Sequence, residues 1–192
     1  MTHKPSSSRV RLAVVSLCVS LMAAVASCDS GGDLGGGVFA TEAGASVVTS
    51  RVDAIVAKSD GGGFVGPAPA GAACDRQIWS YSFVLSNGML TWSRCAVTGT
   101  GANASDYVPE TGARTLTTSE RDAARAAANA VKVSSRNICG ADKPTLSVEV
   151  RAGQTSKAYG DDFYSCTTMF DIYVESEGLD ALAAMLSSLA HQ

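Results

Sequence analysis

Histidine is almost absent from this chain of 192 residues, which contains only His3 and His191. Ser–His–Asp triads, histidine acid/base relays and zinc sites with two or more histidines all depend on that side chain. We interpret the segment around His3 as a cleaved leader, so His191 alone is left for the folded part. Sites of these classes cannot be built from this chain alone. We expect no catalytic residue, no metal and no cofactor.

Two short motifs that carry chemistry are also missing. The chain has no Gly-x-Ser-x-Gly sequence, the strand-to-helix elbow of many serine hydrolases, and its serines have no histidine to act as a base. Its six cysteines are spaced too widely for a Cys-x-x-Cys metal knuckle or redox centre. The sequence therefore indicates a protein that is not an enzyme.

Charge is sparse as well. Only 17% of the residues are charged, the net charge is −3, and no cluster of lysine and arginine occurs. Residues 1–27 hold three cations and no acid, so the remainder carries a net charge of −6. A mildly acidic chain without a basic patch is a poor ligand for nucleic acid. We expect no nucleic-acid partner.

The N-terminal segment has the features of an export signal. Residues 1–11 are basic and residues 12–25 are apolar apart from two serines, a run shorter than the roughly 20 apolar residues of a membrane span. The next residues, Val25-Ala26-Ser27-Cys28, resemble a bacterial lipobox. This resemblance implies export, cleavage before Cys28 and a diacylglycerol on its sulfur. The alternatives are an uncleaved anchor helix and a site for ordinary signal peptidase at Ala24-Val25-Ala26.

These features predict a simple domain organisation. Residues 1–27 form a lipoprotein signal peptide, residues 28–44 a flexible tether rich in glycine, serine and aspartate, and residues 45–192 a single domain. The expected location is the cell envelope. There the lipid, with its palmitate-type chains, would hold the protein to a membrane on the periplasmic or outer surface.

The folded part keeps four cysteines, Cys74, Cys95, Cys139 and Cys166. An even number in an oxidising compartment predicts two disulfides. Of the three possible pairings we favour Cys74–Cys95 and Cys139–Cys166, because each keeps the bridge within one β-unit.

Alternating side chains predict a hairpin in the first half of the domain. Residues 76–85 and 89–97 alternate around Asn87-Gly88, a strong signal for a two-residue turn. Such a turn pairs Leu85 with Leu90, and it places one set of large side chains on the core face and Cys95 on the other. The members of this set are Tyr81, Phe83, Leu85, Leu90 and Trp92. An earlier strand is expected within residues 47–58, with a short helix as its competitor.

The second half predicts helices and further strands. Thr117 and Glu120 match a capping box, and the helix that follows runs to about residue 133, with Ala123, Ala127, Ala130 and Val131 as a small-residue stripe. Residues 145–151 and 168–174 alternate as strands, and 157–159 is a short partner. A final amphipathic helix has apolar residues at helical spacing, Leu179, Leu182, Ala183, Leu186, Leu189 and Ala190. The predicted fold class is α+β: an antiparallel sheet with two helices packed on one face, stapled by two disulfides.

Three groups of residues could carry binding or chemistry. Asp161 and Asp162 form the only close acidic pair, but they lack the ligand spacing of a calcium site, which favours a solvated turn. Residues 139–144, with Asp142 and Lys143 at the tip, form either a recognition loop or, as we favour, a disulfide-anchored turn. The aromatic side chains of the hairpin are expected in the core rather than on a glycan platform, with Trp79 at the strand end as the exception.

Two further resemblances concern the folded part. Cys139-Gly140-Ala141-Asp142, with the segment 161–166, resembles bacterial lipoproteins of high-GC genomes and implies no activity. Gly62-Gly63-Phe64 at a strand end, before a strand–helix–strand–helix order, is similar to emfourin-type inhibitors of thermolysin-like metalloproteases. The four cysteines, the lipid anchor and the longer loops depart from that family.

Three functional hypotheses follow. The first is a lipid-anchored, non-catalytic envelope protein that binds a protein or a surface polymer. The second is an emfourin-like inhibitor of secreted metalloproteases. The third is a histidine-free hydrolase that uses carboxylates alone, for which Asp161 and Asp162 are the only close pair.

Overall fold

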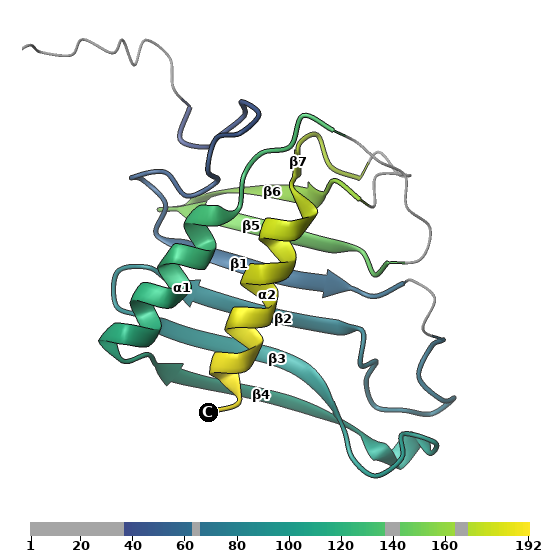
Figure 1. Cartoon of the computed structure of the whole chain (residues 1–192). Coiled ribbons are helices and arrows are strands. Elements are labelled where there is room, and N and C mark those ends of the chain that lie inside the picture. Colours follow the sequence, from purple (N-terminus) through teal and green to yellow (C-terminus); the bar gives the residue numbers. More distant parts are fainter. Residues whose placement is uncertain (1–36, 63–65, 137–142, 164–168) are drawn as a thin grey trace, which may run out of the picture. The chain divides into compact units, whose positions relative to one another are not determined.

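Figure 1 shows the computed structural model of the chain, which describes residues 37–62, 66–136, 143–163 and 169–192. Its contacts divide the chain into Met1–Leu34 and Gly35–Gln192, and the second unit is described below. Several residues singled out in the sequence lie outside the described residues: Cys28, Gly63, Phe64, Cys139, Asp142 and Cys166.

A seven-stranded sheet forms the body of this unit, in the order β4-β3-β2-β1-β5-β6-β7. All neighbours in this order are antiparallel except β6 and β7, which are parallel. The strands are β1 (Ala54–Asp60), β2 (Ile78–Val84), β3 (Met89–Val97), β4 (Tyr107–Thr115), β5 (Leu146–Ala152), β6 (Thr155–Asp161) and β7 (Tyr173–Val174). The first strand is thus confirmed against the helical alternative, although it begins at Ala54.

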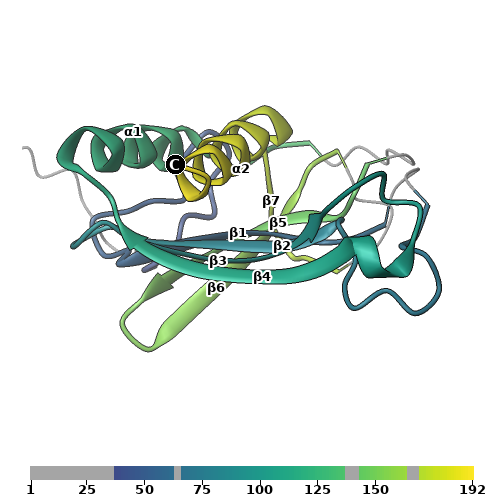
Figure 2. The same cartoon turned by 90° about the horizontal axis from the view of Figure 1, so that it is seen from below.

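Two helices, α1 (Thr118–Ala130) and α2 (Ser176–Ala190), lie on the same face of the sheet, as the edge-on view in Figure 2 shows. A short 3-10 helix, η1 (Ala104–Asp106), precedes β4. The α+β class, the mostly antiparallel sheet and the placement of both helices on one face are confirmed. One of the two expected disulfides, Cys74–Cys95, lies within the described residues.

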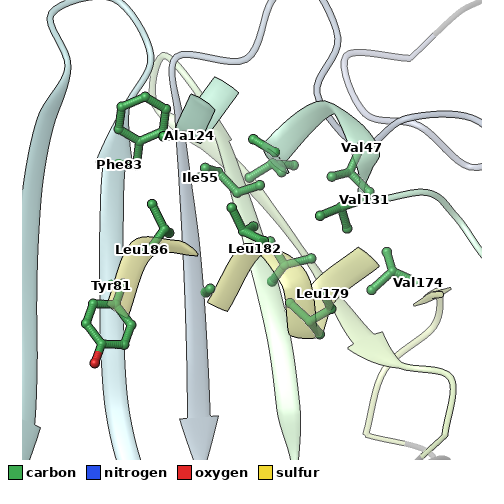
Figure 3. Close-up of a cluster of buried hydrophobic side chains, with 14 of the residues drawn as sticks. Val47, Ile55, Tyr81, Phe83, Ala124, Val131, Val174, Leu179, Leu182 and Leu186 are labelled. Atoms are coloured by element: carbon green, nitrogen blue, oxygen red, sulfur yellow. The ribbon is translucent and has the colours of Figure 1, made fainter. Parts of the chain in front are cut away.

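The core fills the space between the helices and the sheet (Figure 3). All six apolar positions expected on α2 are buried. The expected small-residue stripe on α1 is confirmed in part: Val131, which follows the helix, is buried, and Ala127 packs half-buried against the core. The fully buried residues within the helix are Ala124 and Ala128, which the expectation did not include. Gly178 of α2 lies against α1, where a Cβ atom would stand 2.9 Å from the Ala130 carbonyl oxygen.

The hairpin has a different register from the one expected. Phe83 lies opposite Leu90 and Tyr81 opposite Trp92, a shift of two residues. Four residues, 85–88, separate β2 from β3, and the N–H of Gly88 donates a hydrogen bond to the Val84 carbonyl at 2.9 Å. Of Asn87 and Gly88, the central pair of the expected two-residue turn, only Gly88 has a positive φ, whereas that turn needs one at both. A shift of two keeps every side chain on its own face, so Tyr81, Phe83 and Leu90 are buried as expected.

Two other segments also differ from expectation. The strand expected over residues 168–174 is reduced to the two residues of β7, since residues 169–172 follow a bend. Part of the expected tether lies against the domain: Phe39 and Ala40 pack on the core, and the Ala40 carbonyl accepts a hydrogen bond from the buried Tyr159 hydroxyl at 2.9 Å. The short partner expected around residue 158 is confirmed as β6.

Candidate functional site

The Cys74–Cys95 disulfide positions one end of the candidate site. The pairing expected from the sequence is confirmed, with the two Cα atoms 5.6 Å apart. For this, the chain folds back at Asp75, whose side-chain oxygen accepts a hydrogen bond from the Gln77 N–H at 2.8 Å and whose carbonyl accepts one from Ile78 at 3.0 Å. The fold-back holds Arg76 beside the end of β3.

A pocket of about 330 Å³ opens next to this disulfide, between α2 and the strands β2 and β3. Small side chains of α2 leave the hollow, and larger side chains of the hairpin form its opposite wall. The lining residues are Arg76, Trp79, Tyr81, Arg94, Cys95, Ala183, Ala184 and Ser187.

Two aromatic rings shape this pocket. Trp79 and Tyr81 point to the same side of β2, with ring centroids 5.3 Å apart and planes inclined by 46°. Tyr81 is buried, and its hydroxyl lies 3.2 Å from the Ser187 hydroxyl of α2. Trp79 is half-buried and packs against the core, as does Trp92 of β3. Trp79 is therefore not the single exception among the hairpin aromatics that its place near the strand end led us to expect.

The two arginines of the pocket are in different electrostatic situations. Arg94 Nη2 lies 2.7 Å from Glu110 Oε2, and its Nη1 contacts the His191 ring. The hydrogen bond from Arg94 lowers the pKa of Glu110. Arg76 is exposed, and no carboxylate among the described residues pairs with it. The pocket therefore has two guanidinium groups. That of Arg94, on the wall, is paired with Glu110, whereas that of Arg76, at the mouth, has no carboxylate partner among the described residues.

The acidic pair lies elsewhere, at the start of α2, and it is not a solvated turn. Asp161 and Asp162 are only 2% and 3% exposed, which contradicts the expectation from the sequence. Asp161 lies 2.6 Å from Lys143 Nζ, and Asp162 accepts hydrogen bonds from the Ser134 hydroxyl at 2.5 Å and the Ser176 N–H at 3.0 Å. Burial of both groups is possible because partners distant in sequence surround each carboxylate.

Lys143 is the cation of this cluster. Its ammonium also contacts the Ser176 hydroxyl and lies 2.9 Å from Asp180 and 5.8 Å from the centre of the Phe163 ring. Burial opposes the charged form, but the hydrogen bonds to Asp161 and Asp180 outweigh it and raise the pKa of Lys143. An ammonium held charged cannot take a proton from a nucleophile, and Lys143 points inward rather than standing at the tip of a recognition loop.

The cluster therefore has a structural role that the sequence did not reveal. Glu175, the residue before α2, makes no side-chain cap, and Asp162 accepts the Ser176 amide hydrogen in its place. Each oxygen of the two carboxylates has a donor, the fourth being the Phe163 N–H at 2.9 Å from Asp161. Since no carboxylate oxygen is left over for acid/base work, this geometry gives no support to the hydrolase hypothesis.

The described ranges lack two kinds of feature. Residues 37–62, 66–136, 143–163 and 169–192 contain no group of three or more His, Cys, Asp or Glu side chains that could hold a metal ion. Within the same ranges, no helix has both the length and the apolar character needed to cross a membrane.

The pocket of Trp79, Tyr81 and the two arginines is thus the candidate functional site. Comparisons with protein-family models, with curated proteins and with solved structures found no match to this chain, so the interpretation of the site depends on its own geometry.

Proposed function

We propose that this protein is a non-catalytic binding module, exported and anchored to the cell envelope by a lipid on Cys28, which binds a protein or a surface polymer through the pocket between α2 and β2–β3. One observation carries the proposal: a half-buried tryptophan lies at a pocket together with an arginine that pairs with no carboxylate among the described residues.

The composition of the pocket supports binding. Ligand sites combine an apolar surface with a few polar groups that set orientation. Here Trp79 supplies a half-buried aromatic ring, and Arg76 supplies hydrogen-bond donors that pair with no carboxylate among the described residues. The hydroxyls of Tyr81 and Ser187 lie at the same pocket. Tryptophan and arginine are also the residues most enriched among those that dominate binding energy.

The pocket is also held rigidly. Its walls are two paired strands and a helix, and the disulfide ties the segment that carries Arg76 to β3. A site built on such elements loses little conformational freedom when a ligand binds, and less of the interaction energy is then lost to ordering.

Site-specific photo-crosslinking in envelope extract tests the proposal. Ala184 is an exposed pocket residue of α2, and Ala126 is an exposed residue of α1 away from the pocket. A photoreactive residue at position 184, in the full chain, is expected to capture one partner, and Trp79→Ala should abolish that capture. Equal labelling from positions 184 and 126, or capture that survives Trp79→Ala, would contradict the proposal.

A second candidate is an emfourin-like inhibitor of secreted metalloproteases. The order of elements after residue 64 favours it, since strands β2 to β4 are followed by α1, then β5 to β7, then α2. An inhibition assay against thermolysin-like proteases separates the two candidates. Absence of inhibition at micromolar protein would eliminate this one and leave the binding module.

A further inference from the structure

The chemistry of the pocket points to one class of ligand: we propose that it binds a single acidic saccharide ring of a surface polymer, with the ring on Trp79 and the carboxylate on Arg76. This inference rests on the proposed function and narrows its ligand from a protein or polymer to an acidic polysaccharide.

The size of the pocket sets the first limit. Its volume of about 330 Å³ lies at the lower end of ligand pockets, which span about 300–1,000 Å³. It can hold one ring of a larger molecule but not an extended oligomer or a folded segment of protein. The remainder of the ligand must therefore lie outside, as the neighbouring units of a polymer would.

The lining sets the second limit. A saccharide ring has an apolar face of C–H groups and an edge of hydroxyls, so it needs an aromatic surface next to hydrogen-bonding groups. Trp79 offers the aromatic surface, and Ser187 and Tyr81 bring hydroxyls to the same hollow. These two hydroxyls lie 3.2 Å apart and contact each other, and a purely apolar ligand would remove water from their remaining hydrogen-bonding positions, which is costly.

The charge of the pocket sets the third limit. Glu110 neutralises Arg94, so the free positive charge belongs to Arg76. A guanidinium binds a carboxylate through two parallel hydrogen bonds, a geometry that other cations do not offer. Because the chain as a whole is acidic, an arginine with no carboxylate partner among the described residues, beside the half-buried Trp79, favours an anionic ring over a neutral one.

Isothermal titration of the full chain with oligogalacturonate of three residues tests this inference, with the carboxyl-reduced trisaccharide as the neutral ligand. The acidic ligand is expected to bind at least about tenfold more tightly, the effect of one charge-assisted contact. Arg76→Gln should weaken the acidic ligand more than the neutral one, so that the two affinities become about equal. Trp79→Ala should weaken both ligands.

Arg51→Gln is the matched control, since Arg51 is another exposed arginine. It precedes β1, and the start of β1 pairs with the end of β2 that lies away from the pocket. The substitution should change neither affinity. Arg76 is exposed, so its replacement tests the inference even if Trp79→Ala fails to fold.

Three results would overturn the inference: equal affinity for the two trisaccharides, an unchanged preference in Arg76→Gln, or tighter binding of a hexapeptide of glutamate than of the acidic saccharide. If the titration gives one of these results while position 184 still crosslinks a protein in a Trp79-dependent way, the acidic saccharide is refuted as the ligand. The proposed binding module then still stands. Loss of that crosslinking as well would refute both.

Discussion

At the scale of single residues, Gly112 of β4 shows how one missing side chain shapes the sheet. Trp92 of β3 lies opposite Gly112, and its ring occupies the space where a Cβ atom at position 112 would stand. The indole N–H of Trp92 lies 3.4 Å from Glu110, the same carboxylate that holds Arg94. The absence of a side chain at Gly112 thus allows the Trp92 ring to pack close to Arg94, a residue of the candidate site.

Gly112→Ala tests this close packing. The added methyl must displace the Trp92 ring, and overpacking of this kind costs about 1–3 kcal/mol. Urea unfolding followed by tryptophan fluorescence should show the loss. Ala113→Ser, on the neighbouring exposed residue of the same strand, should stay within about 0.5 kcal/mol. Equal midpoints for the two variants would contradict this account of Gly112.

Lys143 belongs to the same scale, because its removal leaves Asp161 buried without a cation. Breaking a buried ion pair costs about 3–5 kcal/mol. The cost is lower for Lys143, because 20% of its side chain is exposed and solvent screens its charge. Lys143→Met should therefore destabilise strongly. Lys157→Met is the control, since Lys157 pairs at 3.4 Å with an Asp171 side chain that is 90% exposed, and it should cost no more than about 1 kcal/mol.

The pH dependence of Lys143 adds a second readout. Its pKa is raised above the ordinary value of 10.5 in the folded protein, so the pair stabilises fully below that value and its contribution is lost as pH rises through the raised pKa. The alkaline decline in stability should be shallower in Lys143→Met than in the natural chain. An identical alkaline decline in both proteins would contradict the charge assignment.

At the scale of elements, each helix begins in a different way. The start of α1 is capped locally: the Glu120 N–H donates to the Thr117 hydroxyl oxygen at 3.4 Å, and the Glu120 carboxylate accepts the Thr117 N–H at 2.8 Å. The start of α2 is capped by Asp162, which belongs to a segment before β7. The cap of α1 therefore depends only on neighbouring residues, whereas the cap of α2 requires the segment around Asp162 to be in place.

Glu120 makes the acid stability of α1 testable. Hydrogen bonds from Arg114 and from Thr117 lower the pKa of Glu120 from 4.5 to about 2. Because this folded-state pKa is depressed, the stabilisation is present above pH 4.5 and is lost as pH falls from there toward 2. Glu120→Gln should be destabilised at neutral pH and should lose less stability between those values. Glu177→Gln, in the exposed first turn of α2, should behave like the natural chain.

At the scale of the whole molecule, covalent links tie distant parts together. Cys74–Cys95 closes a loop with a sequence separation of 21, which corresponds to about 3 kcal/mol in the chain-entropy treatment. The double variant Cys74→Ser/Cys95→Ser should lower stability by about this amount and weaken binding at the pocket. Unfolding curves with and without reductant measure it, and unchanged stability would contradict the assigned role.

Peptide mapping of unreduced protein tests the remaining pair at the same time. The pairing Cys139–Cys166 stays a prediction, since both residues lie outside the described ranges. A peptide that joins Cys95 to Cys139 would contradict both bridges, and so would four titratable thiols in oxidised native protein.

The anchor is the other covalent prediction for the whole protein. Cys28→Ser should abolish labelling by a fatty-acid probe and release or misprocess the chain. Ala26→Gly, which keeps a small residue before the cysteine, is the matched control and should still be labelled. A Cys28→Ser protein that carries the label and remains with membranes would show that the lipobox interpretation is wrong.

The sequence by itself determined most of the elements and many of the faces they bury. Alternation predicted β2, β3 and β5, helical spacing predicted all six buried positions of α2, and the capping box located the start of α1. The strand β4 was not predicted. The sequence also indicated the Cys74–Cys95 pairing. The predicted features depend on periodicity, turn chemistry and close spacing, which are local and can be read from neighbouring residues.

The hairpin register was decided only by the tertiary structure. Leu85 leaves the expected pairing because its N–H donates to the Asp53 carbonyl at 2.8 Å and its own carbonyl accepts a hydrogen bond from Arg125 of α1 at 3.1 Å. Both partners lie in other segments, so the local turn signal at Asn87-Gly88 could not reveal the competition for these backbone groups.

The candidate site and the buried acids were decided in the same way. Trp79 and Ser187 meet in one pocket although about a hundred residues separate them, and Asp161 and Asp162 are buried by partners from three other segments. A pattern in sequence shows whether a side chain can be buried, but the cost of burying a charge depends on which partners the fold brings to it. That pairing exists only once the sheet and both helices are in place.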